Sequence, residues 1–275
     1  MSDFYKENIF RENVVFGSLP IGNILDISMN MVEHIKKADI ILVESHREFA
    51  RLLSGVHLFP VTRVLDLNTS AVIYQYDLHS DIDHTNKIND VLLEKSKNNK
   101  ILVVSDEGSS LFLEPGCILK SRLIEHGIPY QVISGPNSAI TSVTNTSRNI
   151  SEFYFGSSLA GVPVEQRDSV FEKIKAVKVP AVFLLTAVDT KPCVEQIQNF
   201  FGDSWTGDLS MNLSMSTEKH IEGNFSDILK YIDDNPAYFA IDEEHKKFAI
   251  VIFPDRYETP HTDQLIYDKE NQVSN

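Results

Sequence analysis

The stretch Lys100–Thr141 reads KILVVSDEGSSLFLEPGCILKSRLIEHGIPYQVISGPNSAIT and determines the fold class. The apolar run Ile101–Val104, which small and polar residues stop, predicts a buried parallel strand. A helix is expected to open at 114–116, where Glu-Pro-Gly supplies an acceptor and a proline suited to the first helical position. Residues 130–133 predict the next strand, and a Gly-Pro turn leads into another helix near Asn137. This alternation predicts an α/β protein with a parallel sheet.

The helix expected after residue 116 has an apolar stripe and a stop signal. We expect Ile118, Leu119, Leu123 and Ile124 to form its buried face. Gly127 stands where a left-handed cap would end the helix.

Two loops follow the expected strands, at 105–110 and at 134–139. In open parallel sheets, ligands bind beyond the carboxyl ends of the strands. Both loops must lie at that edge, so the sequence predicts a ligand site there.

Length and composition predict two domains with sizeable cores. The chain has 275 residues, of which 42% are hydrophobic. We interpret 1–13 as an arm, 14–148 as the first α/β domain, 149–254 as a second α/β domain and 255–275 as a polar tail. Further strands are expected at 14–17, 40–43, 153–155, 181–185, 209–215 and 248–253, and further helices at 165–177 and 190–201. Residues 74–81 are expected to form a polar, aromatic loop.

The net charge, the apolar segments and the cysteines indicate which partners and which cell compartment to expect. A formal net charge of −14 disfavours a protein that grips nucleic-acid phosphates. No apolar segment approaches the length of a membrane span, and residues 1–8 are unlike a signal peptide. Cys117 and Cys193 are expected to be reduced and mostly buried, as in a cytoplasmic protein.

Four motifs resemble the tetrapyrrole-methylase superfamily of S-adenosylmethionine-dependent methyltransferases. The similarity is closest to the branch that methylates a cytidine ribose 2′-hydroxyl of small-subunit ribosomal RNA. The motifs, in chain order, are LPIGNILDI at 19–27, ADIILVESHR at 38–47, VSDEGSS at 104–110 with EPG at 114–116, and GPNSAIT at 135–141.

The resemblance implies two α/β domains with S-adenosyl-L-methionine in the cleft between them, and a homodimer. The cofactor contacts that it implies are Pro20, Asp106, Glu107, Gly108, Ser109, Leu111, Asn137, Ser138, Ala139, Leu185, Thr186 and Leu213. The sulfonium is already an activated methyl donor, so catalysis needs mainly orientation and desolvation.

A base could assist methylation of a hydroxyl, and the loops offer Glu44, Asp77 and His79 for this role. Arg47 is a candidate substrate contact, although Glu44 and Arg47 could equally form a solvated surface pair. Residues 79–84 contain histidines and aspartates, but without a second ligand cluster we interpret them as a polar loop and expect no metal.

Several departures from the branch leave the acceptor open. Residues 186–190 lack the branch's His-Arg pair, and 211–216 (MNLSMS) lack its cations. Ribosomal RNA is therefore one interpretation. Methyl transfer to a small molecule, a tetrapyrrole or a peptide is another, and a non-catalytic protein that binds the cofactor is a third.

Overall fold

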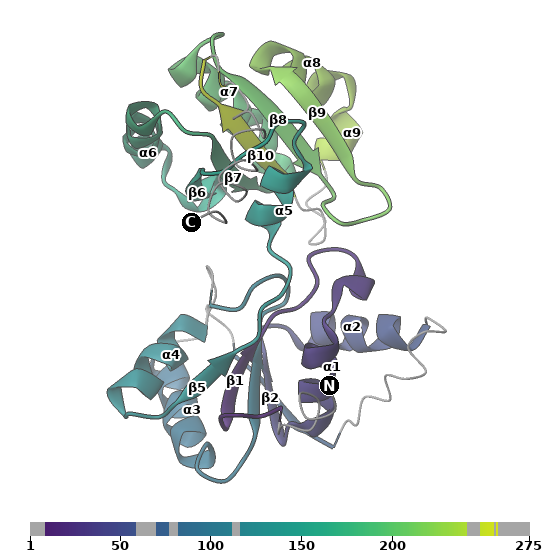
Figure 1. Cartoon of the computed structure of the whole chain (residues 1–275), viewed down its shortest axis with the longest axis vertical. Helices are drawn as coiled ribbons and strands as arrows, with labels where there is room; N and C mark the ends of the chain where they lie inside the picture. Colours follow the sequence, from purple (N-terminus) through teal and green to yellow (C-terminus); the bar gives the residue numbers. More distant parts are fainter. Residues whose placement is uncertain are drawn as a thin grey trace, which may run out of the picture. The chain divides into compact units, whose positions relative to one another are not determined.

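The computed structural model describes residues 9–58, 70–76, 82–111, 116–240, 248–255 and 257. The chain divides into two compact units, Met1–Asn137 and Ser138–Asn275 (Figure 1). The expected boundary lay at 148. Helix α5 (Ser138–Asn145) accounts for the difference, because it packs against strands β7 and β10 of the second unit.

The first unit contains a parallel sheet, as predicted. Its described strands are β1 (Val14–Gly17), β2 (Ile40–Val43), β3 (Val72–Gln75), β4 (Ile101–Val104) and β5 (Tyr130–Val132). They are ordered β3-β2-β4-β1-β5, and every neighbouring pair is parallel. The described helices are η1 (Ile24–Asp26), α1 (Met29–Lys37), α2 (His46–Leu58), α3 (Ile82–Lys95) and α4 (Gly116–Glu125).

Helices cover both faces of this sheet (Figure 1). Val15 and Leu102 pack with residues of α1 and α2, whereas Phe16 and Val103 pack with residues of α3 and α4. Successive side chains of a strand point to opposite faces, so strands that are covered on both faces need continuous apolar runs. This explains why the runs at 14–17, 40–43 and 101–104 were predicted with the observed bounds.

The expected buried face of α4 is wrong in two of its four positions. Leu119 and Leu123 are each 1% exposed, but Ile118 is 41% and Ile124 is 59% exposed. Only the narrow stripe at spacing i, i+4 reaches the sheet, and its flanking positions face outward. The cap prediction is confirmed, because Gly127 has φ of +64° and closes the helix end.

The loop expected at 74–81 begins differently from the prediction. Residues 74 and 75 belong to β3, which pairs with β2 at the edge of the sheet. Tyr76 is buried, and its hydroxyl donates to Asn89 Oδ1 at 3.1 Å. Residues 77–81 lie outside the described part of the chain.

The second unit contains a mixed sheet. Its described strands are β6 (Tyr154–Ser158), β7 (Ala181–Leu185), β8 (Thr206–Met211), β9 (Lys219–Asn224) and β10 (Phe248–Phe253). Their order is β6-β7-β10-β8-β9; only β6 and β7 pair in parallel, and the other pairs are antiparallel. The described helices besides α5 are η3 (Leu159–Gly161), α6 (Val164–Val177), α7 (Ala187–Phe201), α8 (Phe225–Asp234) and α9 (Pro236–Phe239).

The strand expected at 209–215 is shifted, and β9 was not predicted. Strand β8 ends at Met211 because Asn212 has φ of +54° and Ser214 has φ of +65°. Strand β9 (KHIEGN) lies at the edge of the sheet and has no apolar run. Charged edge strands protect a sheet against further pairing, but they give little sequence signal. Cys193 is buried as expected, whereas Cys117 is exposed.

Candidate functional site

The loops after β1 and β4 leave the first sheet side by side. The two strands are neighbours with Gly17 opposite Val104. Beyond them, Leu19 and Gly108 each donate their backbone N–H to the other's carbonyl at 3.0 Å. Gly108 has φ of +73°, a conformation that favours glycine. The buried Pro20 follows directly, so the Pro20 loop and the 105–110 loop form one edge.

Ser18 joins these loops to the loop after β5. Its buried hydroxyl donates to the Ile133 carbonyl at 2.9 Å and accepts from the Ser110 N–H at 3.4 Å. A Cβ at Gly135 would lie 2.5 Å from Ser18 Cβ. This close approach requires glycine at 135, and it brings the three loops together at the carboxyl edge of the sheet.

Ser109 connects the two loops that the sequence singled out. Its hydroxyl donates to the Pro136 carbonyl at 3.0 Å, and Asn137 Nδ2 donates to Ser109 Oγ at 3.3 Å. The next predicted residues, Ser138 and Ala139, begin helix α5.

The loop after β2 joins the same edge through carboxylates. The Ser45 N–H donates to Asp106 Oδ1 at 2.8 Å, and the Asp106 N–H donates to Glu44 Oε2 at 3.3 Å. The exposed side chain of Arg47 lies 3.3 Å from Glu48. Glu44 therefore supports the Asp106 loop, which is a positioning role that the sequence did not predict.

Leu111 has φ of +66°, which is uncommon for a leucine. Residues held in such sparsely populated conformations cluster at ligand clamps and active sites. The described part of the loop thus contains a glycine in the left-handed conformation and a strained leucine at its far end. Glu107 directly precedes Gly108 and is half-buried.

The residues predicted from the second unit share one edge of its sheet. Leu185 and Met211 lie on either side of Phe248 in register, so β7 and β8 end at the same edge. Thr186 follows β7 and caps α7, because its hydroxyl accepts from the Asp189 N–H at 3.2 Å. Leu213 is fully buried in the turn after β8.

Asn212 is a candidate that sequence reasoning missed. It is 5% exposed, and its Nδ2 donates to Thr217 Oγ1 at 3.0 Å and to the Tyr238 hydroxyl. Its Oδ1 is buried and has no hydrogen-bond partner among the described residues. A buried acceptor oxygen without a partner, at the end of a strand, is suited to accept a hydrogen bond from a donor group of a ligand. The only sequence signal is an asparagine, a residue that tolerates the left-handed conformation, directly after a strand.

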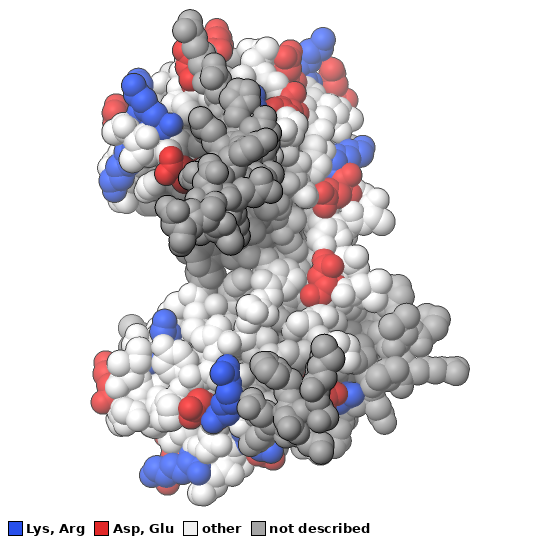
Figure 2. Space-filling model, viewed as in Figure 1, with Lys and Arg blue, Asp and Glu red and all other residues white. Residues whose placement is uncertain are grey.

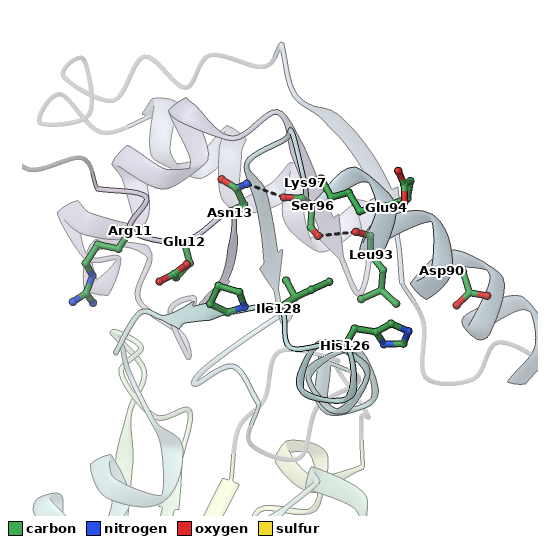
Figure 3. A pocket seen from close by; sticks show the side chains of 11 residues that line it. Arg11, Glu12, Asn13, Asp90, Leu93, Glu94, Ser96, Lys97, His126 and Ile128 are labelled. Carbon is green, nitrogen blue, oxygen red and sulfur yellow. Dashed lines mark hydrogen bonds and ion pairs between the residues drawn. The ribbon is translucent and has the colours of Figure 1, made fainter.

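A cavity of about 640 Å³ lies at the other edge of the first sheet (Figure 3). Its lining includes Asn13 and Pro129, which precede β1 and β5, and residues near the ends of α3 and α4. Asn13 donates to the Ser96 carbonyl at 2.8 Å, and Ser96 donates to the Leu93 carbonyl at 2.8 Å. The cavity is separate from the candidate site, because it adjoins the amino ends of the strands.

His79 and Asp81 lie outside the described residues, as do the side chains of Asp83 and His84. Among the side chains that are described, no group of three or more His, Cys, Asp or Glu residues is placed to hold a metal ion. None of the described helices is long and apolar enough to cross a membrane.

Comparisons with known proteins agree with this arrangement. The family model of the tetrapyrrole (corrin/porphyrin) methylases matches residues 13–228. The chain is 27% identical over 179 residues to ribosomal RNA small subunit methyltransferase I of Rickettsia prowazekii, a match that covers 65% of this chain but only 59% of that protein. It is 24% identical to the protein of the same name from Mesomycoplasma conjunctivae, with coverage of 84% and 90% respectively.

A solved structure shares the fold. It is the uroporphyrin-III C-methyltransferase of Thermus thermophilus, complexed with S-adenosylhomocysteine. The TM-score is 0.53 at 15% identity, and the alignment covers 86% of this chain and 96% of that one.

The chain belongs to the tetrapyrrole methylases, a family of methyltransferases. The resemblance seen in the sequence is thereby confirmed, and so is the expected class of two α/β units.

Proposed function

We propose that this protein is an S-adenosylmethionine-dependent methyltransferase whose acceptor is a ribose 2′-hydroxyl of small-subunit ribosomal RNA. The observation that carries the proposal is the hydrogen-bonded assembly of the loops after β1, β2, β4 and β5 at one sheet edge. The family membership and the names of the relatives support the choice of reaction and acceptor.

The residues present fit the cofactor. Gly108 holds a left-handed conformation that favours glycine, Gly135 lets the loop pack closely on Ser18, and the half-buried Asp106 offers a carboxylate beside them. We assign the cofactor to the following set: Pro20, Asp106, Glu107, Gly108, Ser109, Leu111 and Asn137 of the first unit, and Ser138, Ala139, Leu185, Thr186 and Leu213 of the second. When bound, S-adenosylmethionine supplies a methyl group that its sulfonium has already activated.

The side chains of this chain orient the reactants more than they exchange protons. Glu44 Oε2 accepts from the Asp106 N–H, so this carboxylate orders the loop rather than serving as the base. Arg47 is exposed in the first turn of α2, and we assign it to an acceptor phosphate. His79 remains the proposed base, if the acceptor hydroxyl needs one.

The charge distribution favours weak, salt-sensitive RNA binding. The chain carries a net charge of −14. On the face drawn in Figure 2, cations and carboxylates are interspersed. Of the basic residues on α6, Arg167 is buried and donates to the Val162 carbonyl at 2.9 Å, so it does not offer its charge to RNA. Lysines such as Lys173 and Lys175 on the same helix are exposed. A structured ribosomal particle, which is recognised by shape, is therefore a better acceptor than free RNA.

Transfer of labelled methyl groups tests the proposal. Purified protein is incubated with labelled S-adenosylmethionine and with small ribosomal subunits from a strain that lacks ribose methylation. We expect label at one ribose 2′-oxygen, and no label with Asp106→Ala. Cofactor binding without label in subunits or in free ribosomal RNA would contradict the assigned acceptor.

A second acceptor class is favoured by one specific observation. The turn at 211–216 carries no cation, and the chain as a whole is acidic. A small molecule, a tetrapyrrole or a peptide needs no such cations. In the same assay with a cell extract, this alternative predicts label in a low-mass or peptide fraction. If the protein is a non-catalytic relative, it should bind the cofactor but transfer label to no fraction.

We also propose a cytoplasmic homodimer, since family resemblance implies a dimer and ribosomal subunits are found in the cytoplasm. Sedimentation equilibrium of the full chain tests the dimer. A mass of one chain, 31.1 kDa, at micromolar concentration would contradict it.

A further inference from the structure

Glu218 connects two segments that carry predicted cofactor residues in the second unit. Its Oε1 accepts from Asn145 Nδ2 at 2.8 Å, at the end of the helix that begins with Ser138. Its Oε2 accepts from the N–H of Ser214, which directly follows Leu213. One carboxylate thus fixes both α5 and the turn after β8.

His220 holds this carboxylate in place. Its Nε2 lies 2.8 Å from Glu218 Oε1, and its Nδ1 lies 3.3 Å from Asp208 Oδ1 and 3.1 Å from Ser210 Oγ. An imidazolium can donate from both nitrogens, whereas a neutral ring must turn a lone pair toward one of the two carboxylates. The arrangement therefore favours the protonated ring.

The charged surroundings of His220 agree with the geometry. Among the described residues, it faces Asp208 on β8, Glu218 before β9 and, on its own face of β9, Glu222, which pairs with Arg148 at 3.1 Å. Partial burial lowers the pKa of His220, but the hydrogen bond to Glu218 and the charge of Asp208 outweigh burial, so the pKa lies above its ordinary value. Burial raises the pKa of Asp208 as well.

We propose that Glu218 is a positioning residue for the cofactor and that protonation of His220 couples this positioning to pH. The inference rests on the proposed cofactor site. Loss of the proton removes the positive charge from the ring that holds Glu218, so this carboxylate orders the turn at 212–217 and α5 less firmly. Cofactor affinity therefore falls as the pH rises through the titration of His220.

Calorimetric titration with S-adenosylhomocysteine between about pH 6 and pH 8, where histidines titrate, tests the inference. For the full-length protein we expect affinity to fall on the order of fivefold across this range, the lower end of typical coupling between sites. His220→Gln should abolish the pH dependence, and Glu218→Gln should lower affinity and flatten the profile. His126→Gln, which alters an exposed histidine of the first unit, should keep the parental profile.

A second readout separates positioning from a merely structural role. Because linkage is reciprocal, saturating S-adenosylhomocysteine must raise the pKa of His220 in NMR titrations by the amount that the calorimetric profile requires. A pH dependence that survives in His220→Gln but disappears in His46→Gln would overturn the inference, as would an unshifted His220. Absence of any binding at any pH would instead refute the cofactor site itself.

Discussion

Glu44 and Asp106 are linked directly across two loops: the Asp106 N–H donates to Glu44 Oε2 at 3.3 Å, and Asp106 Oδ1 accepts from the Ser45 N–H at 2.8 Å. The two residues are 62 positions apart in the sequence. Each carboxylate thereby orders the backbone of the other's loop. Asp106 stands in the loop that we assign to the cofactor, so we expect Glu44 to influence cofactor binding through Asp106.

A substitution pair at Glu44 separates positioning from proton transfer. Glu44→Gln retains an acceptor for the Asp106 N–H, so we expect cofactor affinity and turnover within about threefold of the parent, a difference below 1 kcal/mol. Glu44→Ala removes the acceptor and should weaken binding about tenfold, the cost of one unsatisfied donor. A loss of turnover of several orders of magnitude in Glu44→Gln, with normal cofactor affinity, would identify Glu44 as a base.

Removal of the Asp106 carboxylate should reduce cofactor affinity more than stability. Asp106→Ala leaves the Ser45 N–H without this acceptor and removes a charge from the site, so we expect a loss of affinity of at least about tenfold. Asp90→Ala is the matched control, because Asp90 pairs with Arg122 at the surface. Equal affinity losses in both variants, measured by calorimetry, would show that the Asp106 effect is not local.

Alanine variants of two glycines with left-handed backbone conformations can separate a loss of stability from a loss of cofactor affinity. Gly108 has φ of +73° and Gly127 has φ of +64°, so alanine at either position should cost about 1 kcal/mol of stability. Both variants should therefore unfold at similarly lowered temperatures. Only Gly108→Ala should also lose cofactor affinity, because Gly127 ends α4 away from the loops. Unchanged affinity in Gly108→Ala would remove this loop from the site.

Asn212 is expected to stabilise the second unit in two ways: its side chain forms hydrogen bonds, and asparagine tolerates the left-handed backbone conformation at this position. Asn212→Ala loses the bonds to Thr217 and Tyr238 and strains the positive φ, at a cost of about 2 kcal/mol. Asn212→Gly loses the bonds alone and should recover about half of that cost. Urea denaturation measures both. Equal free energies of unfolding for the two variants would show that the backbone conformation contributes nothing.

Two histidines should shape the pH dependence of stability in opposite directions. The pKa of His220 is raised in the folded state, so its contribution is full below about pH 6.5, the ordinary pKa, and is lost as the pH rises through the folded value. Burial lowers the pKa of His34, so its effect runs the other way, and stability falls as the pH drops below about 6.5. Denaturation of His220→Gln over a pH series should lack the decline on the alkaline side. An unchanged decline would contradict the assignment.

The sequence predicted the elements whose burial leaves a simple pattern. The strands at 14–17, 40–43, 101–104 and 248–253 are continuous apolar runs because both of their faces are covered. Edge strand β9 escaped prediction because its residues are polar, and β3 because its run VIYQ adjoins a polar, aromatic stretch. In helix α4, hydrophobic periodicity did not predict which side chains are buried, because Ile118 and Ile124 fit an apolar stripe and yet face outward.

The meeting of the candidate loops at one sheet edge was predictable, whereas the contacts that support them were not. The glycines and small residues at 105–110 and 134–139 marked the carboxyl ends of strands, where ligands bind. The contacts of Glu44 with Asp106 and of Ser18 with Ser110 join distant segments, so no local pattern records them. Asn212 was missed because its significance depends on a buried, unpartnered oxygen among the described residues, and burial of single polar atoms is a property of the packed fold.

The central claim, a cofactor site formed by these loops, is tested most directly by calorimetric titration of the purified protein with S-adenosylhomocysteine. The account predicts micromolar binding that Asp106→Ala and Gly108→Ala both weaken, while Asp90→Ala and Gly127→Ala do not. Absence of binding to a protein that unfolds cooperatively, and is therefore folded, would contradict the account.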